Sequence, residues 1–185
     1  MFYEIKCTWS TKNAILENYH DKIWGKPCFS DQELFKCLAI QIFQSGLDLR
    51  TILTKLEALN EMFDEFKVQT VADYDQSKLE ALMVCPLIIR NQRKIKAVIH
   101  NADVILKMSQ TGMSFNDFIW SKVDFVPMDL EPKNNAKMMF DLPIARRVCK
   151  DMQELGFQFV GPTNISFFLQ ASGIINTHWV NCSYR

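Results

Sequence analysis

Two Cys/His pairs lie near opposite ends of the 185-residue chain. Cys7 and His20 belong to the first twenty residues, and His178 and Cys182 are four residues apart near the other end. Two thiolates and two imidazoles are a ligand set of closed tetrahedral zinc sites, so a metal bound by all four would tie the two ends together. The spacing does not require this, because six cysteines and three histidines allow many pairings. The alternative is two buried cysteines and two histidines with ordinary hydrogen-bond partners.

Length and composition favour one globular domain over residues 1–185, because 48% of the residues are hydrophobic and only six are glycine. No basic region followed by an apolar run opens the chain, and no apolar stretch reaches the roughly 20 residues of a membrane span. The cysteines are scattered, which predicts a reducing cytoplasm and no disulfide framework. Lys plus Arg and Asp plus Glu balance at 21 each, so any contact with nucleic acid must come from a local patch.

Apolar residues recur at helical spacing along most of the chain, and no alternation lasts long enough for a sheet, so we predict an all-α fold. The expected helices cover Ser10 to His20, Ser30 to Gly46, Asp48 to Leu56, pieces around Phe63 and Phe66 and over 71–74, Ser77 to Met83, Asn91 to Gly112, Ser114 to Trp120, Pro143 to Leu155, and Pro162 to Gly173. Residues 123–142, with Pro127, Pro132 and Asn134–Asn135, are predicted to be a long connection.

Gln41 falls on the apolar stripe of the helix that follows Ser30, in line with Leu34 and Leu38. A buried amide must find hydrogen-bond partners or line a cavity. Both remain open at this point: a core glutamine bonded to backbone, or a polar group in a binding pocket.

Several short motifs together resemble one family. They are Cys7-x-Trp9, Tyr19-His20-Asp21-x-x-Trp24-Gly25, Gln44-x-Gly46-Leu47, Ile88-Ile89-Arg90-Asn91-x-x-Lys94-Ile95, Asn101-Ala102, Gly156-Phe157-x-Phe159-Val160-Gly161, Gln170-Ala171-x-Gly173 and Asn176-x-His178-x-x-x-Cys182. With them the chain resembles the DNA-3-methyladenine glycosylase I family, the constitutive alkylation-repair glycosylases of bacteria, over nearly its whole length and as a divergent member.

The resemblance implies a helical glycosylase fold whose ends are clasped by one structural zinc ion on Cys7, His20, His178 and Cys182. The clasped lobe would comprise residues 1–30 and 160–185. Residues 77–95 would form a helix-hairpin-helix that holds double-stranded DNA with alkylated bases. Its predicted DNA contacts are Arg90, Gln92 and Lys94, with Lys78 as a further candidate. A monomer without an obligate protein partner is expected.

The implied activity is monofunctional hydrolysis of the N-glycosidic bond of 3-methyladenine, with the base flipped into an aromatic pocket. Tyr19 and Gln41 are the predicted catalytic and base-recognising residues, Trp9 would stack on the base, and Leu49 and Ser166 would complete the pocket. Relatives carry glutamate at the position of Gln41 and tryptophan at that of Leu49.

These two replacements weaken the predicted pocket. Each removes about 1–3 kcal/mol of interaction with a cationic base. Together they could lower activity by roughly two to four orders of magnitude. The alternative is therefore a weakened or inactive relative that binds DNA or a modified base without cleaving it. Pro86-Leu87 also stands where relatives have a glycine, and a leucine there would be strained if the turn needed positive φ.

Overall fold

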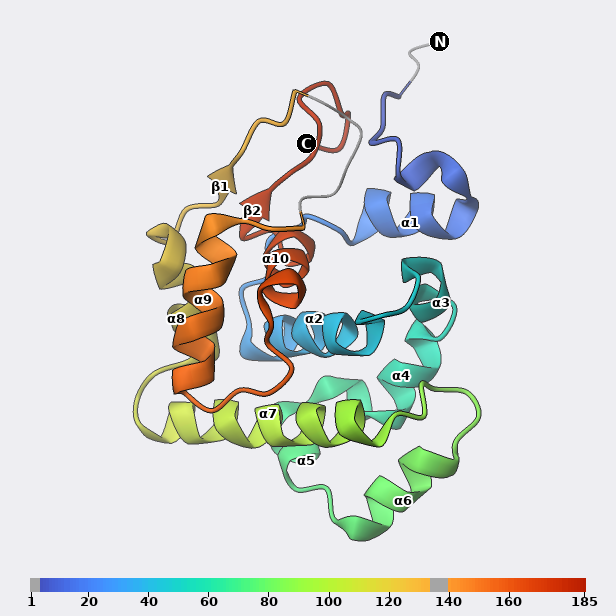
Figure 1. The fold of residues 1–185 in the computed structure, drawn as a ribbon, viewed down its shortest axis with the longest axis vertical. Coiled ribbons are helices and arrows are strands. Elements are labelled where there is room, and N and C mark those ends of the chain that lie inside the picture. Colours follow the sequence, from blue (N-terminus) through green and yellow to red (C-terminus); the bar gives the residue numbers. More distant parts are fainter. Residues whose placement is uncertain (1–3, 134–139) are drawn as a thin grey trace.

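A computed structural model describes residues 4–133 and 140–185 (Figure 1). Its elements are η1 (Ser10–Lys12), α1 (Ala14–Lys22), α2 (Asp31–Gln44), α3 (Leu49–Leu53), α4 (Leu56–Met62), η2 (Asp64–Phe66), α5 (Val68–Ala72), α6 (Gln76–Val84), α7 (Gln92–Gln110), α8 (Phe115–Trp120), η3 (Ser121–Val123), β1 (Met128–Asp129), α9 (Pro143–Glu154), α10 (Pro162–Ala171) and β2 (Ile175–Asn176). The Asn134–Asn135 part of the predicted connection lies outside the described residues.

Helix α2 lies at the centre of the molecule, with α10 packed on one side and α7 on the other (Figure 1). Its buried face contains Leu34, Phe35, Leu38, Ile42 and Phe43, none of which exposes any surface. This apolar stripe at helical spacing is why the segment folds as a helix and why it becomes the core. Gln41 belongs to the same face and therefore enters the interior.

Two predicted helix starts differ from the structure. The Ser10 hydroxyl donates to the Cys7 carbonyl (2.8 Å), and Asn13 caps α1 by accepting from the Leu16 amide. The helix predicted to begin at Ser77 begins at Gln76, with Asp75 as its cap. In each case a neighbouring residue also carries a side-chain oxygen suited to capping, so composition alone does not choose between them.

Other predicted boundaries are confirmed. The Ser30 hydroxyl accepts from the Glu33 amide (3.2 Å) at the start of α2, and Asn91 caps α7. Ser114 caps α8, and a proline occupies the first turn of both α9 and α10. The third predicted helix is interrupted, because the chain leaves the helix after Leu53 and α4 begins at Leu56.

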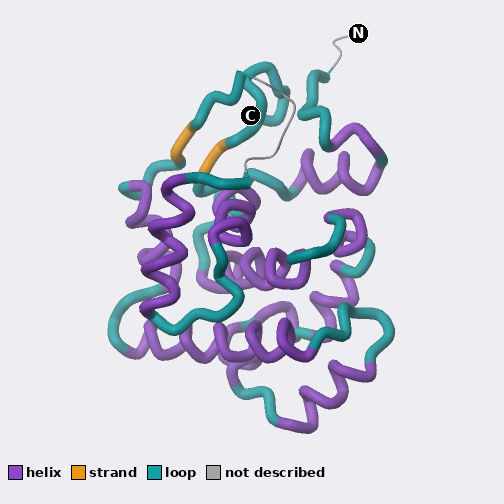
Figure 2. Tube along the Cα trace, in the orientation of Figure 1, coloured by secondary structure: helices purple, strands orange, loops and turns teal. Residues whose placement is uncertain are grey.

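A short strand pair departs from the all-α prediction. Met128 pairs with Ile175 and Asp129 with Asn176 in a parallel register (Figure 2). Two-residue strands carry no detectable alternation, which is why the sequence did not reveal them. The pair joins the segment before α9 to the segment that leads to His178.

Helices α6 and α7 are consecutive, contact each other and are joined by residues 85–91, the region where a helix-hairpin-helix is expected. No residue of this turn has positive φ, so Leu87 does not carry the strain considered above. The Lys55 ammonium donates to the carbonyls of Leu87 (3.0 Å) and Pro86 (3.4 Å), which fastens the turn to the segment before α4.

Helix α7 also holds the loop before α10. The buried Asn101 amide donates to the Gln158 carbonyl (3.0 Å) and accepts from the Gln158 amide (2.8 Å). A membrane span would need a longer apolar helix than any in the described part of the chain.

Candidate functional site

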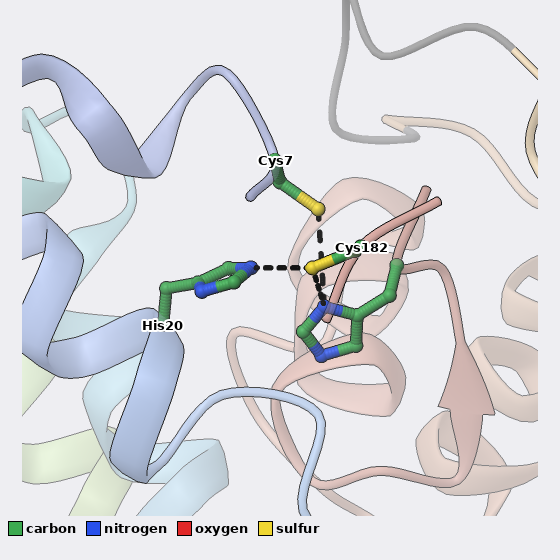
Figure 3. Close-up of side chains that lie close together, drawn as sticks. Cys7, His20 and Cys182 are labelled. Carbon is green, nitrogen blue, oxygen red and sulfur yellow. Dashed lines mark hydrogen bonds between the residues drawn. The ribbon is translucent and has the colours of Figure 1, made fainter. Parts of the chain in front are cut away.

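The four Cys/His residues from opposite ends of the chain converge. Their ligand atoms all lie within 4.8 Å of one another, and all four residues are buried. Cys182 Sγ lies 3.5 Å from both His20 Nε2 and His178 Nδ1, and Cys7 Sγ lies 3.8 Å from His178 Nδ1. Figure 3 shows Cys7, His20 and Cys182 pointing toward one spot. The group can hold a metal ion.

Backbone pairing between the two ends brings these ligands together. The Ser183 amide donates to the Ile5 carbonyl (2.7 Å), and the Ile5 amide donates to the Ser183 hydroxyl (3.1 Å). The Trp179 amide points at Cys7 Sγ (3.5 Å), as expected of a backbone donor to a thiolate. The four residues come only from positions 7–20 and 178–182, so assembly of the group depends on long-range folding.

Asp21 orients His20. Its carboxylate oxygens contact His20 Nδ1 (2.8 Å) and the Lys6 ammonium (2.6 Å). A proton on Nδ1 leaves Nε2, the nitrogen that faces Cys182, with its lone pair free. Carboxylates that fix an imidazole in this way are the usual supporting contact of histidine ligands to metals.

Burial affects the protonation of two members of this group. Burial raises the pKa of the Cys7 thiol to about 12, and burial followed by the neighbouring His20 lowers the pKa of His178 to about 4. A neutral His178 is ready to donate a lone pair, whereas the Cys7 thiol needs a cation to become a thiolate.

Glycine allows the loop after α1 to approach this group. Gly25 has φ +76°, and a Cβ added there would lie 2.7 Å from His178 Nε2. The Gly25 amide donates to the Ala171 carbonyl (3.2 Å), which docks the loop on the end of α10. The Trp24-Gly25 motif therefore serves close packing against the C-terminal segment.

An aromatic cluster adjoins the Cys/His group. Tyr19, Trp24 and Ala171 are buried together, and the partly buried Trp9, Cys37, Leu49 and Leu53 pack around them. The Trp24 ring centroid lies 4.6 Å from that of His178 and 5.0 Å from that of Trp9. Trp9 in turn meets the His20 ring edge-on at 5.4 Å. Trp9 and Trp24 thus belong to the aromatic cluster and also contact the imidazoles of the Cys/His group.

Tyr19 and Gln41 are both buried: Tyr19 is 5% and Gln41 only 3% exposed. Burial raises the pKa of the Tyr19 phenol far above its ordinary range, and nearby Gln41 opposes this shift in part, so the hydroxyl stays protonated. Gln41 therefore enters the interior close to the Tyr19 phenol.

Two buried polar atoms near these residues have no hydrogen-bond partner among the described residues. They are Ser166 Oγ, on α10 where it packs against α2, and Trp24 Nε1. Buried donors and hydroxyls are rarely left unpaired in proteins, and a site for a polar ligand is one reason for the exceptions. Ser166 was predicted for the pocket. Trp24 was not, although its place in the Tyr-His-Asp-x-x-Trp-Gly motif was the available signal.

A cavity of about 270 Å³ opens beside Tyr19. It is lined by Ala14, Ile15, Asn18 and Tyr19 of α1, by Ile23 directly after that helix, by Leu53 of α3 and by Leu56 of α4. Leu49 starts α3, which Asp48 caps by accepting from the Arg50 amide (2.8 Å). The cap fixes the start of the helix that brings Leu53 to the cavity, whereas Leu49, like Trp9, Gln41 and Ser166, is not among the lining residues.

The hairpin residues predicted to contact DNA divide into two groups. Arg90 and Gln92 are exposed at the start of α7. Lys94 is 6% exposed, and its ammonium donates to the carbonyls of Ser45 (2.5 Å) and Phe43 (2.9 Å) at the end of α2. In this arrangement the Lys94 ammonium is bonded to backbone carbonyls at the end of α2, a role that the expected DNA contact did not include.

Lys78, the further candidate, is also engaged within the protein. Its ammonium pairs with Asp64 at 3.0 Å and lies 4.7 Å from the centre of the Tyr74 ring. A phosphate would have to compete with that carboxylate.

Comparison with known proteins places this geometry in a family. The family model for methyladenine glycosylases matches residues 9–185. The chain is 32% identical to the DNA-3-methyladenine glycosylase of Haemophilus influenzae over 177 residues, which is 96% of either chain. It is 33% identical to DNA-3-methyladenine glycosylase 1 of Escherichia coli, covering 96% of this chain and 95% of that one.

A solved structure agrees with these sequence matches. A tyrosine-to-phenylalanine variant of 3-methyladenine DNA glycosylase I, crystallised with 3-methyladenine, superimposes with a TM-score of 0.91 at 34% identity. The match covers 97% of this chain and 96% of that one. The chain therefore has the fold of a base-excising glycosylase. It belongs to the methyladenine glycosylase family.

Proposed function

We propose that this protein is a DNA glycosylase that hydrolyses the N-glycosidic bond of 3-methyladenine in alkylated double-stranded DNA. The observation that carries the proposal is the burial of Gln41 and of Tyr19, the latter within an aromatic cluster, in a chain that belongs to this family. We infer no lyase step, because no lysine of this sequence can be named as the amine that would form a Schiff base with the sugar.

Hydrolysis of this glycosidic bond needs little catalytic assistance from the pocket. Adenine methylated at N3 is cationic while attached to the sugar, so its glycosidic bond is already weak and the base leaves neutral. The protein must extrude the base, hold it by its edge and faces, and let water reach the sugar. We assign edge contacts to Tyr19 and Gln41, with the unpaired Ser166 hydroxyl as a further hydrogen-bonding group, and stacking to Trp9.

Gln41 makes this pocket neutral on its polar side. An amide keeps the shape and hydrogen-bonding groups of a carboxylate but lacks the charge that favours a cationic base, worth about 1–3 kcal/mol. Leu49 supplies an apolar face where a stacking ring is absent. We therefore expect a slower enzyme that still discriminates by shape.

For DNA we propose contacts from the exposed start of α7, through Arg90 and Gln92. Contacts of this kind hold the phosphate backbone and carry no sequence information. Lys94 enters the proposal only as the residue that fastens the end of α2, and with it the helix that bears Gln41.

We propose that the Cys/His group binds one structural zinc ion. A tetrahedral zinc ion with Zn–S of about 2.3 Å and Zn–N of about 2.0–2.1 Å separates sulfur from nitrogen ligands by about 3.6 Å. The corresponding distances here are 3.5, 3.5 and 3.8 Å. Four protein ligands leave no position for water, so the ion would hold the ends of the chain. Elemental analysis should find one zinc per chain, and a Cys182→Ser variant should lose it. If native protein purified without zinc shows the same thermal stability before and after zinc is added, the proposal is overturned.

The remaining expectations from the sequence stay proposals: one domain over residues 1–185 with a clasped lobe at 1–30 and 160–185, and a cytoplasmic monomer. Analytical ultracentrifugation of the full chain tests the oligomeric state.

The activity is tested by release of free base from DNA that carries 3-methyladenine. Native protein should release base faster than the spontaneous rate, and Gln41→Glu should raise the rate by about 5–150-fold, the equivalent of 1–3 kcal/mol. Gln153→Glu is the matched control, because it adds the same charge at an exposed position on α9. Release by Gln41→Glu alone would make the native chain a binding protein, and release by neither would overturn the glycosylase proposal.

A further inference from the structure

The start of α7 has an outer and an inner side. Arg90 and Gln92, the proposed DNA contacts, are exposed there, whereas Lys94 is only 6% exposed. Helices α2 and α7 pack together, and the end of α2 lies on the same side of the molecule as the start of α7 (Figure 1). This short stretch therefore meets solvent through two side chains and reaches the helix that bears Gln41 through a third.

Lys94 holds the last carbonyls of α2. Its ammonium donates to the carbonyls of Phe43 (2.9 Å) and Ser45 (2.5 Å). The last turn of α2 contains no basic residue of its own. A side chain from another helix thus supplies the hydrogen bonds and the positive charge that the carboxyl end of a helix favours.

A chain of hydrogen bonds continues from this ammonium to Gln41. Ser45, whose carbonyl accepts from Lys94, donates its amide to the Gln41 carbonyl (3.1 Å). Gln41 belongs to the same last turn, and its side chain enters the interior. A displacement of Lys94 relative to α2 would therefore move the turn that carries the residue proposed to recognise the base.

The turn that precedes α7 is fastened from another side. Lys55, between α3 and α4, donates to the carbonyls of Leu87 (3.0 Å) and Pro86 (3.4 Å). The next residue, Leu56, lines the cavity beside Tyr19. Two ammonium groups thus tie the start of α7 and its preceding turn to elements that surround the proposed pocket.

We propose that Lys94 is a positioning residue for base excision, which fixes Gln41 relative to the DNA backbone held at the start of α7. The inference rests on the proposed function, because it needs DNA at Arg90 and Gln92 and a base at Gln41. A flipped base remains attached to the backbone, so the group that holds the base must keep a constant distance from the groups that hold the backbone. A buried side chain that joins the two regions keeps this distance.

Single-turnover release of 3-methyladenine tests the positioning role in the full chain. In Lys94→Met the rate at saturating DNA should fall by about 10–100-fold, whereas the DNA concentration that gives half the maximal rate should change by less than about twofold. Lys94→Arg, which keeps a cationic donor, should recover part of the rate. Rates are compared well below the Tm of each variant, so a loss of stability alone does not lower them.

Lys107→Met is the matched control. It removes the same charge from the last turn of α7, where the side chain is 68% exposed, and should keep the native rate. A native rate at saturating DNA in Lys94→Met would overturn the positioning role. A loss confined to the half-saturating DNA concentration would overturn it as well, and would make Lys94 a direct DNA contact.

Hydrogen exchange with an undamaged DNA duplex reports the coupling without any chemistry. Binding of the duplex should slow exchange of the Ser45 amide in native protein but not in Lys94→Met, whereas the amides at the start of α7 should be protected in both. Protection of Ser45 that persists in Lys94→Met would overturn the inference. If neither native protein nor Gln41→Glu releases base, the glycosylase proposal fails, and the exchange result alone decides whether Lys94 couples the two regions.

Discussion

Replacement of Gly173 by alanine should destabilise the protein strongly, because the position combines positive φ with a close backbone approach. Gly173 has φ +70°, and a Cβ there would lie 2.4 Å from Pro27 N and 2.5 Å from the Lys26 carbonyl carbon. Contacts that short cannot persist, so one of the two backbone segments must move.

The magnitude follows from comparison with a glycine in open space. Gly156 has φ +92°, but an added Cβ would meet nothing within 4 Å. Gly156→Ala should therefore cost about 1 kcal/mol of unfolding free energy, from the left-handed backbone less the entropy gained in the unfolded chain. Gly173→Ala adds the overlap with a second backbone segment, typically about 1–3 kcal/mol, for a total of about 2–4 kcal/mol.

Urea denaturation followed by far-ultraviolet circular dichroism measures the difference between the two variants. In a chain of this size the larger loss corresponds to a fall in Tm of about 4–16 °C. Gly173→Ala should also weaken metal retention, because the displaced loop continues into Gly25, which packs on His178. If Gly173→Ala is no more destabilising than Gly156→Ala, the close approach does not limit packing and this reasoning is refuted.

Three further changes separate structural from functional roles. Asn101→Ala should lower the unfolding free energy by about 2–4 kcal/mol, because it leaves the backbone amide and carbonyl of Gln158 unpaired. A loss smaller than that of an exposed Asn→Ala control would contradict this. Lys94→Met should lower stability by about 1–3 kcal/mol without changing the salt dependence of DNA binding, whereas Arg90→Ala should reduce the slope of log K against log salt by about 1. The Tyr74 hydroxyl and then Lys78 hold the pKa of Asp64 below its ordinary value, so Asp64 stabilises the fold above that value and the contribution disappears as pH falls through the folded pKa. At pH 6 the native protein should therefore be more stable than Asp64→Asn by no more than about 1 kcal/mol, because the carboxylate is partly exposed. The difference in unfolding free energy should vanish at the lowest pH at which the protein still folds.

Much of the helical layout could be predicted, because amphipathic stripes and caps are local. The stripe through Leu34 and Leu38 correctly placed Gln41 in the interior. The choice of cap failed where two suitable oxygens lie a few residues apart, as with Ser10 and Asn13. The strand pair β1–β2 was missed because its stabilising partner lies far along the chain.

The sites were harder to predict from residues alone. Convergence of Cys7 with Cys182 depends on backbone pairing between the two ends, for which no spacing rule exists. The burial of Lys94 has the same origin: its partners are carbonyls at the end of a different helix.

The pairing of the two ends also determines the order in which contacts can form while the polypeptide is being synthesised. Trp9 and Tyr19 emerge first from the ribosome, yet the segments that complete their surroundings, Ala171 and the Ile5–Ser183 pairing, arrive last. At about 5–20 residues per second this delay lasts roughly 10–40 s. A nascent chain that has not yet reached Ser183 would thus lack these contacts around Trp9 and Tyr19.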